Sequence, residues 1–149
     1  MTMAGVAVLD LFAGSGALGI EALSRGAGRA VFVDRSAAAA ITIRANLAAL
    51  GLSGRAEVIC APADRALQRL LPGRERFELV FVDPPYRDDA SSDILWRLVA
   101  ADLLAPAAWV VVHQYKRAPE AGAPELEAVA RTVTGDHRVV IFRRAASPA

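Results

Sequence analysis

Apolar residues along the chain fall into short runs rich in β-branched side chains, and segments with helical spacing separate one run from the next. Such runs predict strands, and apolar positions three and four residues apart predict helices. Strands are predicted at residues 6–11, 29–34, 57–60, 77–82 and 108–115. Helices are predicted at residues 17–25, 36–50, 64–71 and 91–100. Because strand and helix alternate, we expect an α/β fold with a doubly wound, mostly parallel sheet.

The C-terminal part of the chain departs from this alternation. Two β-rich runs, residues 128–134 and 138–143, flank Gly135 and Asp136. A glycine and an aspartate between two such runs are typical of a two-residue hairpin turn. We therefore expect a C-terminal antiparallel hairpin, which brings the sheet to seven strands.

Turn and cap residues also mark helix ends, with Ser36 as the expected N-cap of the second helix and Pro72-Gly73 after the third.

Length and composition narrow the class of protein. A chain of 149 residues, 54% of them hydrophobic, is expected to form one domain over residues 1–149. Its 17 basic and 16 acidic residues nearly cancel, which excludes a strong overall positive field. Cys60 is the only cysteine, which excludes an internal disulfide, and we interpret it as a core residue. No apolar stretch approaches the roughly 20 residues that span a bilayer, so we expect a soluble, cytoplasmic protein without membrane contact.

A glycine-rich turn joins the first predicted strand to the first helix. It contains the pattern G-x-G-x-x-G from Gly14 to Gly19, and Asp34 stands 20 residues after Gly14. This pattern is typical of dinucleotide-binding proteins, in which the acid binds a ribose diol. S-adenosylmethionine also carries a ribose diol, so the pattern leaves that cofactor and a nicotinamide cofactor both open. Phe12 precedes the glycines as Phe-x-Gly-x-Gly, which resembles base-amino methyltransferases, and this resemblance implies that Asp10 and the turn bind the cofactor. The predicted cofactor-binding residues are Asp10, Phe12, Ala13, Gly14, Ser15, Gly16, Asp34, Arg35, Ala63 and Asp64. Asp64 is alternatively the N-cap of the third helix.

A second candidate segment, Asp83-Pro84-Pro85-Tyr86, directly follows the fourth predicted strand. The two prolines stiffen the backbone and leave carbonyl acceptors beside the Asp83 carboxylate. These acceptors suit an exocyclic amino group on an aromatic ring, with Tyr86 stacked on the ring after the base is extruded. Holding the nitrogen directs its lone pair at a methyl donor, which is catalysis by positioning and electrostatics without a metal. We therefore predict Asp83, Pro84, Pro85 and Tyr86 as the catalytic residues.

Both motifs carry a resemblance to a known family. From about Val8 to Phe142, the chain resembles the bacterial methyltransferases that modify guanine N2 in 16S ribosomal RNA. The stretches that carry the resemblance are residues 9–27, Asn46-Leu47 and residues 82–86. The resemblance implies S-adenosylmethionine as the cofactor and the small ribosomal subunit, or its assembly intermediate, as the partner. We expect a monomer. The family normally carries an upstream segment that helps to bind RNA, and we expect this chain to lack it.

Several positions outside the motifs bear on this resemblance. Arg87, Lys116 and Arg117 follow the fourth and fifth strands and are predicted to contact RNA phosphates, the alternative being solvated surface charge. The fifth strand of the family often ends in glutamate where this chain has His113, to which we assign no catalytic role. Pro62 stands where the family often has an acid.

Three other functions stay open on the sequence. A DNA adenine-N6 methyltransferase also carries Asp-Pro-Pro-Tyr, although no stretch here is long enough for the usual target-recognition insertion. The pattern from Gly14 to Gly19 permits a nicotinamide-dependent oxidoreductase. A cofactor-binding but inactive methyltransferase-like module is the third.

Overall fold

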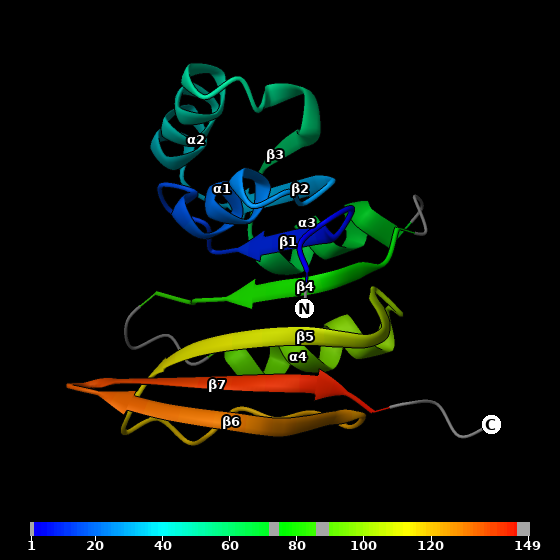
Figure 1. The fold of residues 1–149 in the computed structure, drawn as a ribbon. Helices are drawn as coiled ribbons and strands as arrows, with labels where there is room; N and C mark the ends of the chain where they lie inside the picture. The colour runs from blue at the N-terminus through cyan, green and yellow to red at the C-terminus, as the bar shows by residue number, and fades with distance from the viewer. Residues whose placement is uncertain (1, 72–74, 86–89, 146–149) are drawn as a thin grey trace.

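The computed structural model describes residues 2–71, 75–85 and 90–145. Over these residues the strands are β1 (Ala7–Leu11), β2 (Arg29–Asp34), β3 (Ala56–Cys60), β4 (Phe77–Val82), β5 (Leu104–Tyr115), β6 (Leu126–Thr134) and β7 (His137–Arg144). The helices are α1 (Ala17–Ser24), α2 (Ala37–Ala49), the 3-10 helix η1 (Ser53–Arg55), α3 (Ala63–Leu70) and α4 (Ser91–Ala100). The predicted alternation of strands and helices, with two further strands at the end, is confirmed (Figure 1).

The described strands form one seven-stranded sheet with the order β3-β2-β1-β4-β5-β7-β6 (Figure 1). The first five strands pair in parallel, and β7 pairs antiparallel with both β5 and β6. Thr134 pairs with His137, so Gly135 and Asp136 form the predicted two-residue turn. The strand order reverses between β1 and β4, and open α/β sheets bind ligands outside the carboxyl ends of the strands at such a point.

The two faces of the sheet are covered by different helices. Val31 and Val33 of β2 pack in one cluster with the apolar residues of α3 and α4, whereas Phe32 between them packs with those of α1 and α2. Figure 1 shows the two pairs of helices on opposite sides of the sheet. This confirms the doubly wound arrangement, and it explains why the central strands appear in the sequence as continuous apolar runs.

Two expectations about local structure are wrong. The fifth strand begins at Leu104, four residues before the predicted start, and its register against β4 shifts between Phe77 and Leu79. Pro106 is typical of loops in a sequence because it has no backbone N–H to donate to a sheet. Ala107 has a φ of 58°, so the strand is irregular at this point. Cys60 is exposed rather than in the core, because it ends an edge strand.

The predicted N-cap of α2 is confirmed, whereas the alternative N-cap for α3 is not. Ser36 is the N-cap of α2, and its hydroxyl accepts a hydrogen bond from the Ala39 N–H at 3.2 Å. Asp64 is not the N-cap of α3: that position is Pro62, and Asp64 lies in the first turn, which leaves its side chain to face the cavity described below. The expected helix end at Pro72-Gly73 lies outside the described residues. Nowhere in the described chain is a helix both long and apolar enough for a membrane span.

Candidate active site

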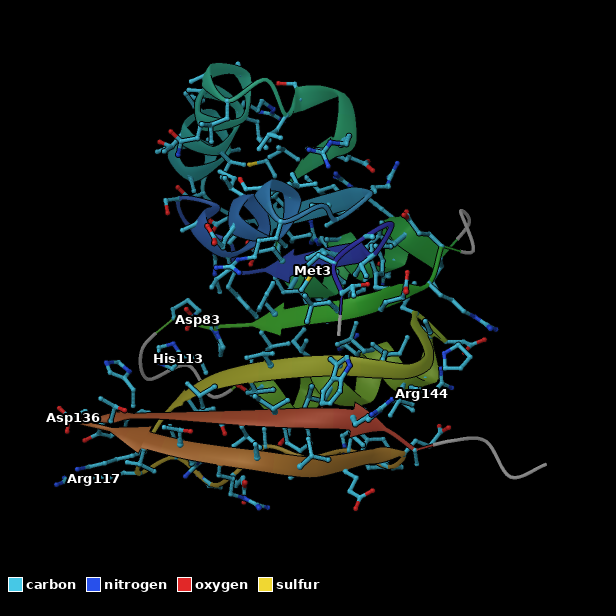
Figure 2. All side chains as sticks on the ribbon, viewed as in Figure 1. Met3, Asp83, His113, Arg117, Asp136 and Arg144 are labelled. Atoms are coloured by element: carbon cyan, nitrogen blue, oxygen red, sulfur yellow. The ribbon has the colours of Figure 1, made fainter. Side chains whose placement is uncertain are left out.

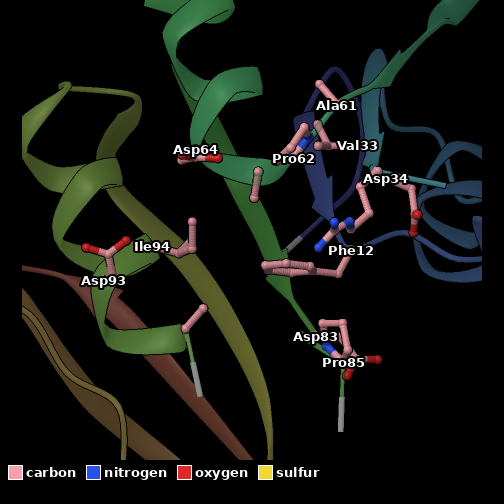
Figure 3. A pocket seen from close by; sticks show the side chains of 13 residues that line it. Phe12, Val33, Asp34, Ala61, Pro62, Asp64, Asp83, Pro85, Asp93 and Ile94 are labelled. Atoms are coloured by element: carbon pink, nitrogen blue, oxygen red, sulfur yellow. The ribbon is translucent and has the colours of Figure 1, made fainter. Parts of the chain in front are cut away.

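The two candidate segments leave the sheet side by side. β1 and β4 are parallel neighbours, and Leu11 at the end of one pairs with Val82 at the end of the other. Phe12 and Asp83, which follow these residues, therefore emerge at the same edge. Figure 3 shows Phe12 above Asp83 and Pro85 on one side of a shared cavity. The glycine-rich turn and the Asp-Pro-Pro segment therefore meet at one cavity.

A cavity of about 330 Å³ lies at this edge, which is within the size range of small-molecule sites. It is lined by Phe12, Val33, Asp34, Arg35, Ala61, Pro62, Ala63, Asp64, Asp83, Pro85, Ala90, Asp93 and Ile94 (Figure 3). Its described lining thus holds four carboxylates and one guanidinium, and the other lining residues are apolar. Such a lining favours a ligand with a flat apolar part and a positive charge.

The glycine-rich turn beside the cavity is held in an unusual backbone conformation. Gly16 has a φ of 82°, and Phe12 has a φ of 60°, which is uncommon for a residue with a side chain. The turn is tied to the sheet by the Ala13 N–H, which donates to the Val33 carbonyl at 2.9 Å. On its other side, Asn46 Nδ2 of α2 donates to the Ser15 carbonyl at 3.2 Å. The turn is therefore shaped by contacts from two other elements.

Asp34 connects the turn to the end of β2. Its Oδ2 accepts a hydrogen bond from the Gly14 N–H and its Oδ1 accepts one from the Ser36 N–H, both at 2.9 Å. An ionised carboxylate has about four acceptor positions, so two remain for a ligand. Because Asp34 also lines the cavity, these positions suit the two hydroxyls of a ribose.

Asp10 is placed differently from the other predicted cofactor residues. It is 1% exposed, lies beneath the turn, and accepts a hydrogen bond from the Gly19 N–H at 3.1 Å. Burial raises its pKa to about 7, with smaller contributions from the negative charges of Asp83 and Asp34. The described cavity lining does not include it, so its predicted contact with a cofactor stays a prediction.

A further polar contact reaches Asp83 from the next strand. His113 Nδ1 of β5 lies 3.1 Å from Asp83 Oδ1, and Figure 2 shows the two side chains facing one another. The His113 ring also lies 4.7 Å from the His137 ring, centroid to centroid. Sequence reasoning gave His113 no role. No sequence signal places it beside Asp83, because the contact follows from the pairing of Val82 with Val112, a register that only the structure gives.

The remaining predicted residues divide into four groups. Phe12, Arg35, Ala63 and Pro85 line the cavity, whereas residues 13–16 form the adjoining turn. Tyr86 and Arg87 lie outside the described residues. Lys116 and Arg117 are exposed after β5, and Lys116 Nζ lies 3.8 Å from Asp136 Oδ1. The part of the chain that the structure describes contains no group of three or more potential metal ligands.

Comparisons with known proteins give the site a context. The family model described as conserved hypothetical protein 95 matches residues 1–143. YlbH of Bacillus subtilis is 41% identical over 105 residues, or 70% of this chain and 57% of that protein. Ribosomal RNA small subunit methyltransferase D of Haemophilus influenzae is 31% identical over 111 residues, or 74% of this chain and 58% of that protein. A solved structure of a conserved hypothetical protein from Streptococcus pyogenes matches with a TM-score of 0.87 at 33% identity, covering 95% of this chain and 87% of that one. The matched part of the chain thus spans less than two thirds of the length of the first two relatives.

Proposed function

This chain belongs to the family described as conserved hypothetical protein 95, and on that premise, together with its similarity to ribosomal RNA small subunit methyltransferase D, we propose that it methylates guanine N2 in 16S ribosomal RNA. S-adenosylmethionine is the proposed methyl donor. The observation that carries the proposal is the single cavity lined by Phe12 of the glycine-rich turn and by Asp83 of the Asp-Pro-Pro segment. Binding of a donor and binding of an acceptor are thereby combined in one space.

The lining residues fit S-adenosylmethionine. The two remaining acceptor positions of Asp34 suit the ribose diol, and the apolar walls around Val33 and Ile94 suit an adenine ring. Asp64, in the first turn of α3, is the proposed acceptor for the adenine amino group. The excess of carboxylates in the lining favours a cofactor that carries a positive sulfonium and an ammonium group.

The same residues disfavour a nicotinamide dinucleotide. In dinucleotide-binding folds the pyrophosphate binds the N–H groups at the start of the first helix. Here the Asp10 carboxylate accepts a hydrogen bond from the Gly19 N–H in the first turn of α1. A pyrophosphate would therefore meet a carboxyl group at this helix start and the four carboxylates of the cavity lining. These charges support the sulfonium cofactor over the nicotinamide one.

The chemistry of the acceptor side follows from Asp83 and the prolines. When bound, S-adenosylmethionine supplies an electrophilic methyl group. Asp83 and the Pro84 carbonyl accept hydrogen bonds from the amino group, which is a weak nucleophile because its lone pair is delocalised into the ring. Held in this way, the nitrogen presents its lone pair toward the donor, and the carboxylate stabilises the positive charge that develops on it.

Two assays test this proposal. Calorimetry with S-adenosylmethionine and with NAD measures cofactor choice, and we expect binding of the first alone. Transfer of a labelled methyl group is then measured on 30S particles, assembly intermediates, free 16S ribosomal RNA and duplex DNA, with mass mapping of the product. We expect N2-methylguanine in the RNA, formed much more slowly but still measurably in Asp83→Ala and at the wild-type rate in Glu21→Gln, an exposed carboxylate on α1.

Each alternative gives a different result in these assays. Binding of NAD without S-adenosylmethionine contradicts the proposal. Methylation of adenine in duplex DNA, with none in RNA, indicates the DNA enzyme. Binding of the cofactor without turnover on any of the RNA substrates indicates an inactive module.

A further inference from the structure

We propose that His113 is a positioning residue for the methyl transfer, whose Nδ1–H holds Oδ1 of Asp83 so that Oδ2 stays available to the target amino group. This inference rests on the proposed function. It goes beyond the predicted catalytic segment, because it adds a residue from a strand that the motif does not include.

The need for an outside partner comes from the residues that follow Asp83. An aspartate that ends a strand commonly accepts a hydrogen bond from the backbone N–H two residues later, which fixes its carboxylate. In this chain the next two residues are Pro84 and Pro85, and neither has an N–H to donate. The Asp83 side chain is also 44% exposed, so packing alone does not hold it. Within the described residues, the partner of its carboxylate comes from another element.

β5 supplies that element. Val112 pairs with Val82 in the parallel ladder, so His113 and Asp83 occupy the next positions on neighbouring strands. Their facing atoms are 3.1 Å apart, which is within hydrogen-bond reach. A carboxylate can only accept, so the nitrogen beside it must carry the proton, and the neighbouring hydrogen bond then selects the tautomer of His113. A rigid strand is a better support for such a contact than a loop.

His137 restricts the movement of the His113 ring. β7 runs antiparallel to β5, and His113 pairs with Val139, two residues from His137. The two imidazoles therefore lie diagonally across the strands, 4.7 Å apart at their centroids and inclined by 49°. A ring packed on one side has fewer accessible rotamers, which lowers the entropy cost of holding Asp83.

Three variants test the role of His113. His113→Leu removes the donor, and we expect kcat to fall roughly 10- to 100-fold, the order of loss that misplacing a reacting group causes, with little change in the Kd of S-adenosylmethionine. His113→Asn returns an N–H near the position of Nδ1 and is expected to restore most of kcat. His137→Phe is the matched control, because it removes an imidazole from the same patch but keeps a ring against His113. We expect its kcat to stay near that of the wild type.

A double-mutant cycle separates positioning from a general structural effect. If His113 acts through Asp83, then His113→Leu has no further effect on single-turnover rates in an Asp83→Ala background. Equal losses in both backgrounds, or a wild-type kcat in His113→Leu, overturn the inference.

Nitrogen NMR of the imidazoles needs neither RNA nor turnover. We expect the proton on Nδ1 of His113 in the wild type and a redistribution toward Nε2 in Asp83→Ala. An unchanged tautomer in Asp83→Ala overturns the pairing, even if His113→Leu fails to fold. Absence of methyl transfer by the wild type contradicts the proposed function instead, and the NMR result still decides whether His113 holds Asp83.

Discussion

Asp10 Oδ2 accepts a hydrogen bond from the Gly19 N–H at 3.1 Å. This contact joins the end of β1 to the first turn of α1 beneath the glycine-rich turn. The carboxyl group is almost fully buried, and burial raises its pKa from 3.8 to about 7. The contact therefore supports the turn at the cost of removing an ionisable group from water.

The raised pKa of Asp10 makes stability depend on pH. Between about pH 4 and 7 the unfolded chain loses this proton while the folded chain keeps it, so the free energy of unfolding falls as pH rises and levels off above pH 7. Asp10→Asn removes this contribution. We expect the variant to gain at most about 3 kcal/mol of stability relative to the wild type as pH rises from 5 to 8, because about two pH units of this range lie below the folded pKa. Urea unfolding at each pH measures the difference, and a constant difference across this range would contradict it.

Gly19 lets α1 approach the sheet closely. A Cβ atom at this position would lie 2.4 Å from Cε1 and 2.8 Å from Cζ of the Phe32 ring, which is buried on the sheet. We expect Gly19→Ala to lower the free energy of unfolding by about 1–3 kcal/mol, measured by urea unfolding. In Phe32→Leu the ring is absent, so the added cost of Gly19→Ala should shrink. Gly122→Ala is the control, because nothing lies within 4 Å of its added Cβ. Equal losses at the two glycines would exclude the close approach as the cause.

Asn46 holds the glycine-rich turn from outside through its bond to the Ser15 carbonyl. Asn46→Leu removes this donor, and we expect the Kd for S-adenosylmethionine to rise roughly fivefold, the effect of losing about one net hydrogen bond. Calorimetry measures the change. Thr42→Ala, at an exposed position one turn earlier on α2, should leave the Kd unchanged. An unchanged Kd in Asn46→Leu would show that the turn keeps its shape without α2.

Lys116 and Arg117 are exposed positive charges directly after the end of β5. If both contact RNA phosphates, reversing them to glutamate weakens binding to 30S particles and lowers the slope of log K against log salt by about 0.7 to 0.9 for each lost contact. Filter binding over a series of salt concentrations measures both. Arg25→Glu, after the end of α1, controls for a charge reversal elsewhere on the surface. An unchanged affinity and slope would assign the pair to solvated surface charge.

Much of the fold was accessible from the sequence alone. Strands buried on both faces, such as β2 and β4, appear as largely apolar runs, because most residues along them are covered by helices on one side or the other. Turn residues such as Gly135 and caps such as Ser36 act through local backbone geometry, so they were predicted at the correct positions. The start of β5 was not, because Pro106 and a positive φ at Ala107 interrupt the local pattern there.

The candidate site was accessible only in part. The motifs placed Phe12 and Asp83 after strands, and the sheet then brought them to one cavity. The sequence by itself determined which residues carry chemistry and at which strand ends they stand, since both properties are local. Only the tertiary structure decided that Asp10 is buried beneath the turn, that Asn46 holds Ser15, and that His113 faces Asp83. These contacts join residues from different elements, so they depend on strand order and register, and local periodicity carries no information about either.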